Sequence, residues 1–386
     1  MDRHIYMDHA ATTPVDTAVV AAMLPFFSNE YGNPSSIHRW GQRADHAVTT
    51  AREDLANILN CGLDEIIFTS CGSESDNLAL RGIALTARER GHGNHIIISS
   101  IEHPAILGTA QHLLKYHGFD VTILPVDQHG FISAEDLRNA IQADTFLVSI
   151  MYANNEIGVI QPILELAKIA HESNILFHTD AVQAAGQLPL NVNELGVDLM
   201  SLSAHKFYGP KGVGLLYARR DTLAHSHQTG GSQENGLRAG TLNVPLIVGM
   251  ATALKIVTAS QSQDNSKMRI LRNKLIKSIL DTIPESHLTG HPTYRLPNNA
   301  SFVFKGIDGN ELIIHLDLSS IAASSGSACK TGNPEPSNVL SALAIQPELS
   351  LGSLRLSIGR HTNESDIEYV QQVLPKVISN MRDNLQ

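Results

Sequence analysis

The sequence predicts an α/β fold with a mostly parallel, seven-stranded sheet, helices on both faces, and a smaller α+β domain after it. Short apolar runs alternate with amphipathic helical patterns from about residue 15 onward, as in parallel sheets that are covered on both faces. The chain has 386 residues, which is more than a typical single domain contains. A polar stretch at 258–267 separates two helical patterns, and we expect the domain boundary there.

Seven short apolar runs are the predicted strands of the large sheet. They occupy residues 65–69, 95–99, 121–124, 146–151, 175–179, 199–203 and 214–217. Helical patterns lie between them at 105–117, 134–141 and 163–173. The last strand follows its predecessor through a short loop, too short for a parallel crossover, so this strand can be an antiparallel member of the sheet.

The second part of the chain predicts a smaller α+β domain. It has strand patterns at 301–304 and 353–356, a helix that starts at Met268, and a final helix at 364–381. We therefore expect a large domain at 15–258 and a small domain formed by 1–14 and 259–386.

Composition excludes several classes of function. The chain has 38 acidic and 28 basic residues, a formal charge of -10, and such a balance disfavours nucleic-acid binding. No continuous apolar run has the length of a membrane span, and the first eight residues are polar and charged rather than the apolar core of a signal peptide. We therefore expect a cytoplasmic protein that binds neither nucleic acid nor membrane.

The sequence does not indicate a metal site. Its three cysteines form no CxxC pair. The pairs His92/His95 and His225/His227 have near-ligand spacing, but no carboxylate or thiol stands beside them. We interpret these histidines as solvated loop residues.

The loop after the first predicted strand is a candidate phosphate site, because ligands of open parallel sheets gather beyond the carboxyl ends of the strands. Residues 70–77 are mostly small and open a helix, so Gly72 and Ser73 can present free N–H groups to a phosphate. The alternative is purely structural: Ser73 caps the helix, with Asp76 at the third following position.

Two further loops supply candidate catalytic groups. Asp180, followed by Gln183, ends the predicted strand at 175–179; it can hold a pyridine nitrogen protonated or be a satisfied helix cap. Lys206 comes directly after the strand at 199–203, among Ser203, His205 and an aromatic residue. Partial desolvation there would lower its pKa and favour the neutral amine that forms a Schiff base.

Cys329 lies in a run of small residues that ends in Gly-Asn-Pro. Cysteine is usually buried and inert. This composition instead predicts a mobile exposed loop that could deliver a thiol into a cleft. Both interpretations stay open on the residues alone.

Together these segments resemble the NifS/IscS-type cysteine desulfurases, a family of fold-type-I enzymes that use pyridoxal 5′-phosphate (PLP). The resemblance covers nearly the whole chain, and its specificity comes from the order and spacing of the motifs. They are YMDHAATTP at 6–14, YGNPSS at 31–36, Glu102-His103, NNEIG at 154–158, SAHK at 203–206, RAGT at 238–241, SGSAC at 325–329, and Arg355.

The resemblance implies a role for each matched residue. Lys206 would form the Schiff base with PLP, Asp180 would pair with the pyridinium nitrogen, and Gln183 would bond the phenolic oxygen. His103 would stack on the ring and help to move protons. The phosphate would be held by Gly72, Ser73, Ser203, His205 and, from the other subunit of a homodimer, Thr241. Asn155 and Arg355 would bind the substrate carboxylate, for which the planar guanidinium of arginine is suited.

The implied reaction converts L-cysteine to L-alanine and leaves a persulfide on Cys329. The sulfur would pass to an acceptor protein such as an iron–sulfur scaffold. Cys329 must attack as the thiolate, and the neighbouring Lys330 can lower its pKa.

The sequence departs from the family pattern at three places. Cys71 replaces a usual glycine, residues 330–333 differ from the common Thr/Ser-rich sequence, and the chain ends soon after its last helix, which favours the NifS type. Three alternatives remain: a selenocysteine lyase, which needs the mobile cysteine less; a PLP aminotransferase, in which Cys329 has no role; and a silent family member that acts as a scaffold.

Overall fold

The computed structural model describes residues 4–223, 225–226, 228–326 and 337–383. The helices are α1 (Thr17–Met23), α2 (Pro25–Ser28), α3 (Arg39–Leu59), α4 (Gly72–Arg90), α5 (Pro104–His117), α6 (Ala134–Ala140), α7 (Ile163–Glu172), α8 (Val192–Leu195), α9 (Val244–Thr282), α10 (Gly309–Leu318), α11 (Asn338–Ala342), α12 (Pro347–Ser350) and α13 (Glu364–Asp383). The strands are β1 (Ile5–Tyr6), β2 (Ile66–Thr69), β3 (His95–Ser99), β4 (Asp120–Leu124), β5 (Thr145–Ser149), β6 (Leu176–Asp180), β7 (Leu199–Ser203), β8 (Gly214–Ala218), β9 (Ser286–Leu288), β10 (Asn299–Phe304), β11 (Ile321–Ala322) and β12 (Ser353–Ser357).

The predicted α/β fold with its seven-stranded sheet is confirmed. Within the described residues the large sheet has the strand order β2-β8-β7-β6-β5-β3-β4. The pairs from β7 through β6, β5 and β3 to β4 are parallel, whereas β8 runs antiparallel to both β2 and β7. Strand β8 is therefore the antiparallel member that the short loop after β7 predicts.

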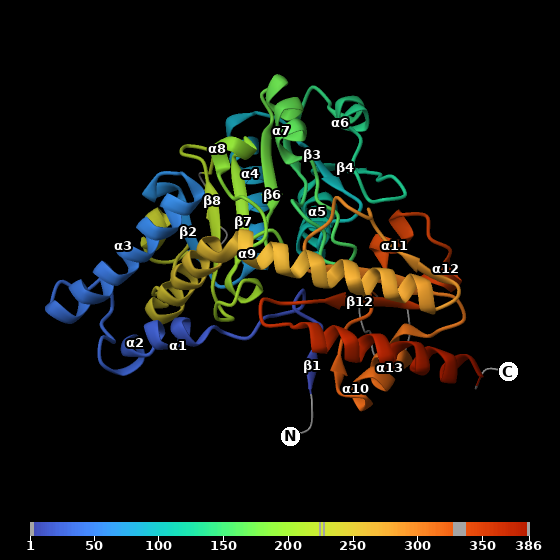
Figure 1. Cartoon of the computed structure of the whole chain (residues 1–386). Coiled ribbons are helices and arrows are strands. Elements are labelled where there is room, and N and C mark those ends of the chain that lie inside the picture. The colour runs from blue at the N-terminus through green and yellow to red at the C-terminus, as the bar shows by residue number, and fades with distance from the viewer. Residues whose placement is uncertain (1–3, 224, 227, 327–336, 384–386) are drawn as a thin grey trace.

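Helices cover both faces of this sheet (Figure 1). One face packs on α1, α3, α7 and α9 in the largest hydrophobic cluster, and the other packs on α4 and α5. Every residue of β2, β3, β5, β7 and β8 is buried. This explains why these strands are continuous apolar runs in the sequence rather than alternating ones.

Helix α9 continues without a break through the polar stretch in which we expected the domain boundary. The polar side chains of this stretch are accommodated by local and tertiary bonds. Ser260 donates to Ile256 O and to Asp264, and Gln261 and Asn265 donate to backbone carbonyls of the segment that follows β6. The prediction of two separate helices was therefore wrong, because these side chains bond without ending the helix.

The buried clusters nevertheless change along α9. Its side chains up to Val257 belong to the core of the large sheet, whereas those from Met268 onward belong to a second cluster. We call the two bodies around these clusters the large unit and the small unit. The division of the chain at 14/15 and 258/259 stays a proposal.

The small unit combines two small sheets with helices. Strands β12, β10 and β9 form an antiparallel sheet, and β1 pairs in parallel with β11. Helices α10 and α13 and the second half of α9 pack on them in the second cluster. The N-terminal β1 therefore belongs to the same body as the C-terminal third of the chain (Figure 1).

Residues 7–13 lead from the small unit to the end of β7, and we call them the N-terminal strap. Met7 N–H donates to Ala322 O and His9 N–H to Ser357 O in the small unit. Thr13 then bonds the carbonyl of His205 through both its N–H and its hydroxyl, at 2.9 Å each. The strap thus fastens the two units together beside Lys206.

Two expectations about individual segments need correction. Among the described residues, α9 is long and apolar enough by length and composition to cross a membrane, although its apolar side chains pack into the two cores. His95 is a buried residue of β3 rather than a solvated loop residue, because Thr145 and Thr122 bond its two ring nitrogens at 2.7 and 2.8 Å. His227 lies outside the described residues.

Gly214 at the start of β8 should tolerate no side chain. A Cβ atom there would lie 2.6 Å from the carbonyl carbon of Cys71, and this backbone cannot move without displacing the start of α4. We expect Gly214→Ala to reduce the free energy of unfolding by about 1–3 kcal/mol in urea titrations.

Gly108 is the matched control, because it is an exposed residue of helix α5 and a Cβ there would meet nothing within 4 Å. Gly108→Ala should raise the stability by about 0.5–1 kcal/mol through the higher helix propensity of alanine. Equal effects of the two substitutions would contradict the assigned packing of Gly214.

Candidate active site

A cavity of about 330 Å³ opens where β2, β6 and β7 end and the strap passes. This volume suits a small-molecule ligand. Its walls include the following residues predicted from the sequence: Gly72, Ser73, His103, Asn155, Asp180, Gln183, Ser203, His205, Lys206 and Arg355. The strand ends thus bring together residues that are up to 283 positions apart in the chain (72 to 355).

Lys206 reaches into this cavity from the turn after β7. Its Nζ donates to the carbonyls of Ala10 and Ala11 in the strap, at 2.7 and 2.8 Å. Burial, together with the charge of Arg355, lowers the pKa of Lys206 to about 8, while Asp180 and Asp8 act in the opposite direction. The amine is therefore neutral in a useful fraction near neutral pH, as the sequence predicted.

Asp180 stands at the carboxyl end of β6 and is buried. Its Oδ1 accepts the N–H of Val182 at 2.9 Å, so one oxygen is satisfied in the way a cap residue would be. Burial raises the pKa of Asp180, and Lys206 and the protonated form of His103 oppose that rise. A cationic ring nitrogen in the cavity would likewise favour the carboxylate form.

His103 and Gln183 have fixed orientations. His103 is the N-cap of α5, and its Nδ1 accepts the N–H of Ala105 at 3.1 Å. Burial lowers the pKa of His103, so the neutral ring carries its proton on Nε2. Gln183 donates one amide N–H to the carbonyl of Ala10 at 2.9 Å and retains its second N–H for another acceptor.

The start of α4 provides an anion site. The N-cap residue is Cys71, whose side chain accepts no hydrogen bond from the N–H groups of the helix. The interpretation of Ser73 as the cap was wrong, because the helix already begins at Gly72 and Ser73 lies inside its first turn. A Cβ at Gly72 would lie 2.9 Å from Val182 and 3.2 Å from Ser203, so only glycine fits here. Uncapped N–H groups at a helix N-terminus are suited to a phosphate.

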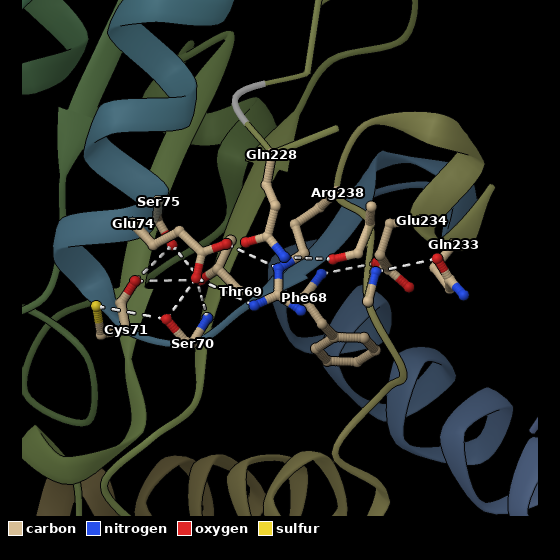
Figure 2. A network of polar contacts seen from close by, with 12 residues as sticks. Phe68, Thr69, Ser70, Cys71, Glu74, Ser75, Gln228, Gln233, Glu234 and Arg238 are labelled. Atoms are coloured by element: carbon tan, nitrogen blue, oxygen red, sulfur yellow. Dashed lines mark hydrogen bonds and ion pairs between the residues drawn. The ribbon is translucent and has the colours of Figure 1, made fainter. Parts of the chain in front are cut away.

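A polar network holds this turn in place (Figure 2). Glu74 accepts the Ser70 N–H at 2.7 Å and pairs with Arg238 Nε at 2.7 Å. Glu234 accepts the Phe68 N–H at 2.7 Å and pairs with Arg52. Glu234 and Arg238 thereby attach the segment around residues 228–241 to β2 and to the turn that follows it.

Arg355 has the geometry of a carboxylate receptor. Its Nη2 pairs with Asp8 at 2.8 Å and its Nη1 donates to Asn155 O at 3.0 Å. Among the described residues its buried Nε has no hydrogen-bond partner. This free donor and the adjacent Asn155 face the same cavity.

One predicted residue that the structure describes is not among the cavity walls. Thr241 is exposed and does not line this cavity. Cys329 and Lys330 lie outside the described residues, as do the other positions from 327 to 336.

The residues present fit PLP. They offer an amine, a buried carboxylate for a pyridinium nitrogen, a helix N-terminus for a phosphate, and an arginine for a substrate carboxylate, all in one cavity. Within the described residues no cluster of side chains could hold a metal ion.

Sequence reasoning assigned no role to several residues of the site. The carbonyls of Ala10 and Ala11 hold Lys206, and Asp8 pairs with Arg355. Asp76 and Glu102 are buried acids whose pKa values are raised by burial, for Glu102 to about 8. The motif at 6–14 and the Glu102-His103 pair include some of these residues. The residue type alone, however, does not indicate that a backbone carbonyl accepts a hydrogen bond or that an acid is neutral.

Comparisons with known proteins agree with this site. The family model "Aminotransferase class-V" matches residues 5–370. The cysteine desulfurase IscS of Dictyoglomus turgidum is 47% identical over 99% of the chain and 96% of the relative, and that of Methanosarcina thermophila is 48% identical over 99% and 94%. A solved structure titled NifS-like protein is 37% identical, with a TM-score of 0.92 over 98% of this chain and 100% of that one. Because relatives with both names match, the NifS type stays a prediction.

The lowered pKa of Lys206 predicts its chemical reactivity. In the apoprotein, labelling by acetic anhydride should be half-maximal near pH 8, because the neutral amine is the nucleophile and burial lowers the pKa to about 8. Peptide mass spectrometry across pH measures this. In the same protein unfolded in urea, the midpoint should move up to about 10.4.

Asp180→Asn sharpens the test, since removing a nearby anion disfavours the charged amine and should lower the midpoint further. A native midpoint equal to the unfolded one would contradict the assigned environment of Lys206.

Proposed function

The chain belongs to the class-V aminotransferase family and is a PLP-dependent cysteine desulfurase, and on that premise we propose the role of each residue in its active site. The observation that carries the proposal is the convergence of Lys206, Asp180 and Arg355 on one cavity. An amine, a cofactor-pairing carboxylate and a substrate-binding cation are the groups needed to hold the cofactor and the substrate together.

We propose that Lys206 holds PLP covalently and that Asp180 pairs with its ring nitrogen. The N–H groups at the start of α4, with Ser73, Ser203 and His205, hold the phosphate. Burial lowers the pKa of His205 to about 4, so its neutral ring acts as a hydrogen-bonding group. Bound PLP supplies an electron sink for the carbanion formed when the α-proton of the substrate leaves.

The substrate carboxylate binds Arg355 and Asn155. The free Nε of Arg355 and its Nη2, now paired with Asp8, lie on one edge of the guanidinium and match a carboxylate in bidentate fashion. Asp8 therefore orients the arginine before the substrate arrives. This contact places the substrate α-carbon on the side of Lys206.

Lys206 removes the α-proton, for which its pKa of about 8 is suited. His103 presents Nε2–H to the cavity and can supply a proton to the product. Gln183 keeps one N–H available for the phenolic oxygen of the cofactor. The two carbonyls of the strap that bind Lys206 Nζ keep the amine in the cavity once it is free.

Cys329 takes the sulfur. Its thiolate attacks the sulfur of the bound substrate, a sulfur–sulfur bond forms and the carbon–sulfur bond breaks. The electron pair of the broken bond stays with the three-carbon skeleton, which is protonated and leaves as L-alanine. The persulfide on Cys329 is then available to an acceptor protein, and an iron–sulfur scaffold is the acceptor we propose.

We further propose that the enzyme is a cytoplasmic homodimer. Large apolar side chains between α1 and α3 are unusually exposed, including Phe27 at 58%, Ile37 at 93% and Trp40 at 51%. A second copy of the chain would cover them. Thr241 is exposed next to the network around Glu74 and would reach the phosphate of the partner subunit.

The main test is turnover of L-cysteine by the purified holoenzyme. We expect equimolar alanine and, with a thiol reductant, sulfide. Cys329→Ala and Lys206→Ala should each lower the rate by at least about 100-fold. Turnover of cysteine by Cys329→Ala at the wild-type rate would exclude the persulfide step.

The dimer is tested by mixing two inactive variants. Lys206→Ala and Thr241→Arg each impair both sites of their own homodimers. In a mixed dimer one site combines an intact Lys206 with an intact Thr241 from the other subunit. Exchanged mixtures should therefore recover about a quarter of the wild-type activity by random pairing. Recovery of no activity, with native mass spectrometry showing the mixed dimer, would contradict the assignment of Thr241 to the partner site.

A further inference from the structure

Glu156 lies between the two ends of the segment that carries Cys329. Its Oε2 accepts the hydroxyl of Ser337 at 2.5 Å, and Ser337 is the first described residue after that segment. On the other side, a Cβ atom built on Gly326 would lie 3.0 Å from the same oxygen, and Gly326 is the last described residue before the segment. One carboxylate oxygen therefore bonds the downstream end and lies close enough to the upstream end to leave little room for a side chain there.

Each end is also attached to a rigid element. Ser337 is the N-cap of α11, where its hydroxyl accepts the N–H groups of Val339 and Leu340. Gly326 N–H donates to the Ser353 hydroxyl at 3.2 Å, at the start of β12. Two residues earlier, Ser324 O accepts the N–H of Arg355 at 2.7 Å. The upstream end thus runs along the strand that carries the substrate-binding arginine.

The backbone of Glu156 is itself fixed. Its N–H donates to Asn154 Oδ1 at 2.8 Å, and its carbonyl accepts the side chain of Asn299 at 3.0 Å. Burial raises the pKa of Glu156 to about 7, against the bond from Ser337 and the charge of Arg355. Glu156 is therefore a partly desolvated carboxyl group that takes no part in the chemistry described above.

We propose that Glu156 is a positioning residue that joins the two ends of the segment bearing Cys329 and fixes them beside the substrate-binding residues Asn155 and Arg355. The proposal rests on the role of Cys329 proposed above. Cys329 follows Gly326 by three residues in the sequence. Fixing both ends restricts the volume that the thiol explores and raises its effective concentration at the cavity.

The proposal separates the two halves of the reaction. Substrate binding and removal of the α-proton use Arg355, Asn155 and Lys206. The side-chain hydrogen bond of Glu156 is with Ser337 and involves none of these residues. Transfer of sulfur needs Cys329 in place. Loss of the Glu156 side chain should therefore slow sulfur transfer and leave the earlier steps intact.

Three variants of the holoenzyme test this. Glu156→Ala removes the junction, Ser337→Ala removes the donor on one side, and Glu156→Gln keeps an acceptor of the same shape without charge. Glu348→Gln in α12 is the control, because Glu348 is exposed and contacts neither end. The change in cofactor absorbance after mixing with L-cysteine reports the early steps, and the release of sulfide and alanine reports turnover.

We expect Glu156→Ala and Ser337→Ala to lower kcat by on the order of 10- to 100-fold, with KM for cysteine and the early absorbance change within about threefold of wild type. Glu156→Gln should retain most of kcat and the control all of it. A Glu156→Ala enzyme with wild-type kcat, or one in which the early change slows as much as turnover, would overturn the proposal.

A second readout needs no activity. Trypsin can cleave after Lys330, inside the joined segment, and release of the ends should make this cleavage faster. In the apoprotein we expect Glu156→Ala and Ser337→Ala to be cut at Lys330 at least about threefold faster than wild type and the control. Unchanged cleavage in both variants would overturn the junction itself. Faster cleavage in a protein without desulfurase activity would instead refute the proposed function and leave the junction standing.

Discussion

The buried amine of Lys206 is the constraint on which the site depends. Its Nζ has two backbone carbonyls of the strap as hydrogen-bond partners, and a carbonyl carries no full charge to balance an ammonium. Desolvation, with the charge of Arg355, therefore outweighs the opposing charges of Asp180 and Asp8 and lowers the pKa of Lys206 to about 8. An aspartate in place of these carbonyls would hold the lysine charged, and a charged lysine is no nucleophile.

Burial also shifts other titratable side chains in and around the pocket toward their neutral forms. Burial lowers the pKa values of His103, His178 and His205 and raises those of Asp76 and Glu102. His178 in turn bonds the hydroxyls of Ser149 and Ser201, at 2.8 and 3.0 Å, which suits a neutral imidazole. Burial raises the pKa of Asp180 as well, so Lys206 and Arg355 are the cationic groups that a ligand meets, and a cationic ring would favour the carboxylate form of Asp180. A cofactor and a substrate with complementary charges then find strong and specific partners in a poorly solvated cavity.

The sequence predicts the large sheet well because its strands are buried on both faces. The limits of β3 and β7 agree with the expected ranges, and those of the other strands differ by two residues or fewer. Prediction from the sequence is weaker where a side chain binds a backbone group, because the backbone is the same for every residue type. Nothing in Ala10-Ala11 indicates that two carbonyls bind a lysine, and Ser73 is a residue type typical of a cap although the extended backbone of Cys71 starts the helix two residues earlier. The polar stretch in α9 was misread because its side chains find partners 70 or more residues away in Gln187 and Leu188.

The strap also sets an order of events during synthesis of the chain. The strands of the large sheet and the first half of α9 that packs on them all precede residue 258, so this body can form while the ribosome is still making the rest. Ile5 pairs with Ile321, and His9 N–H bonds Ser357 O, so the strap gains its small-unit anchors only after both of those positions have left the exit tunnel. Until then Lys206 lacks an anchored pair of carbonyls and Arg355 does not yet exist. The nascent enzyme therefore completes its cofactor pocket only near the end of translation, which makes acquisition of PLP a late step in its maturation.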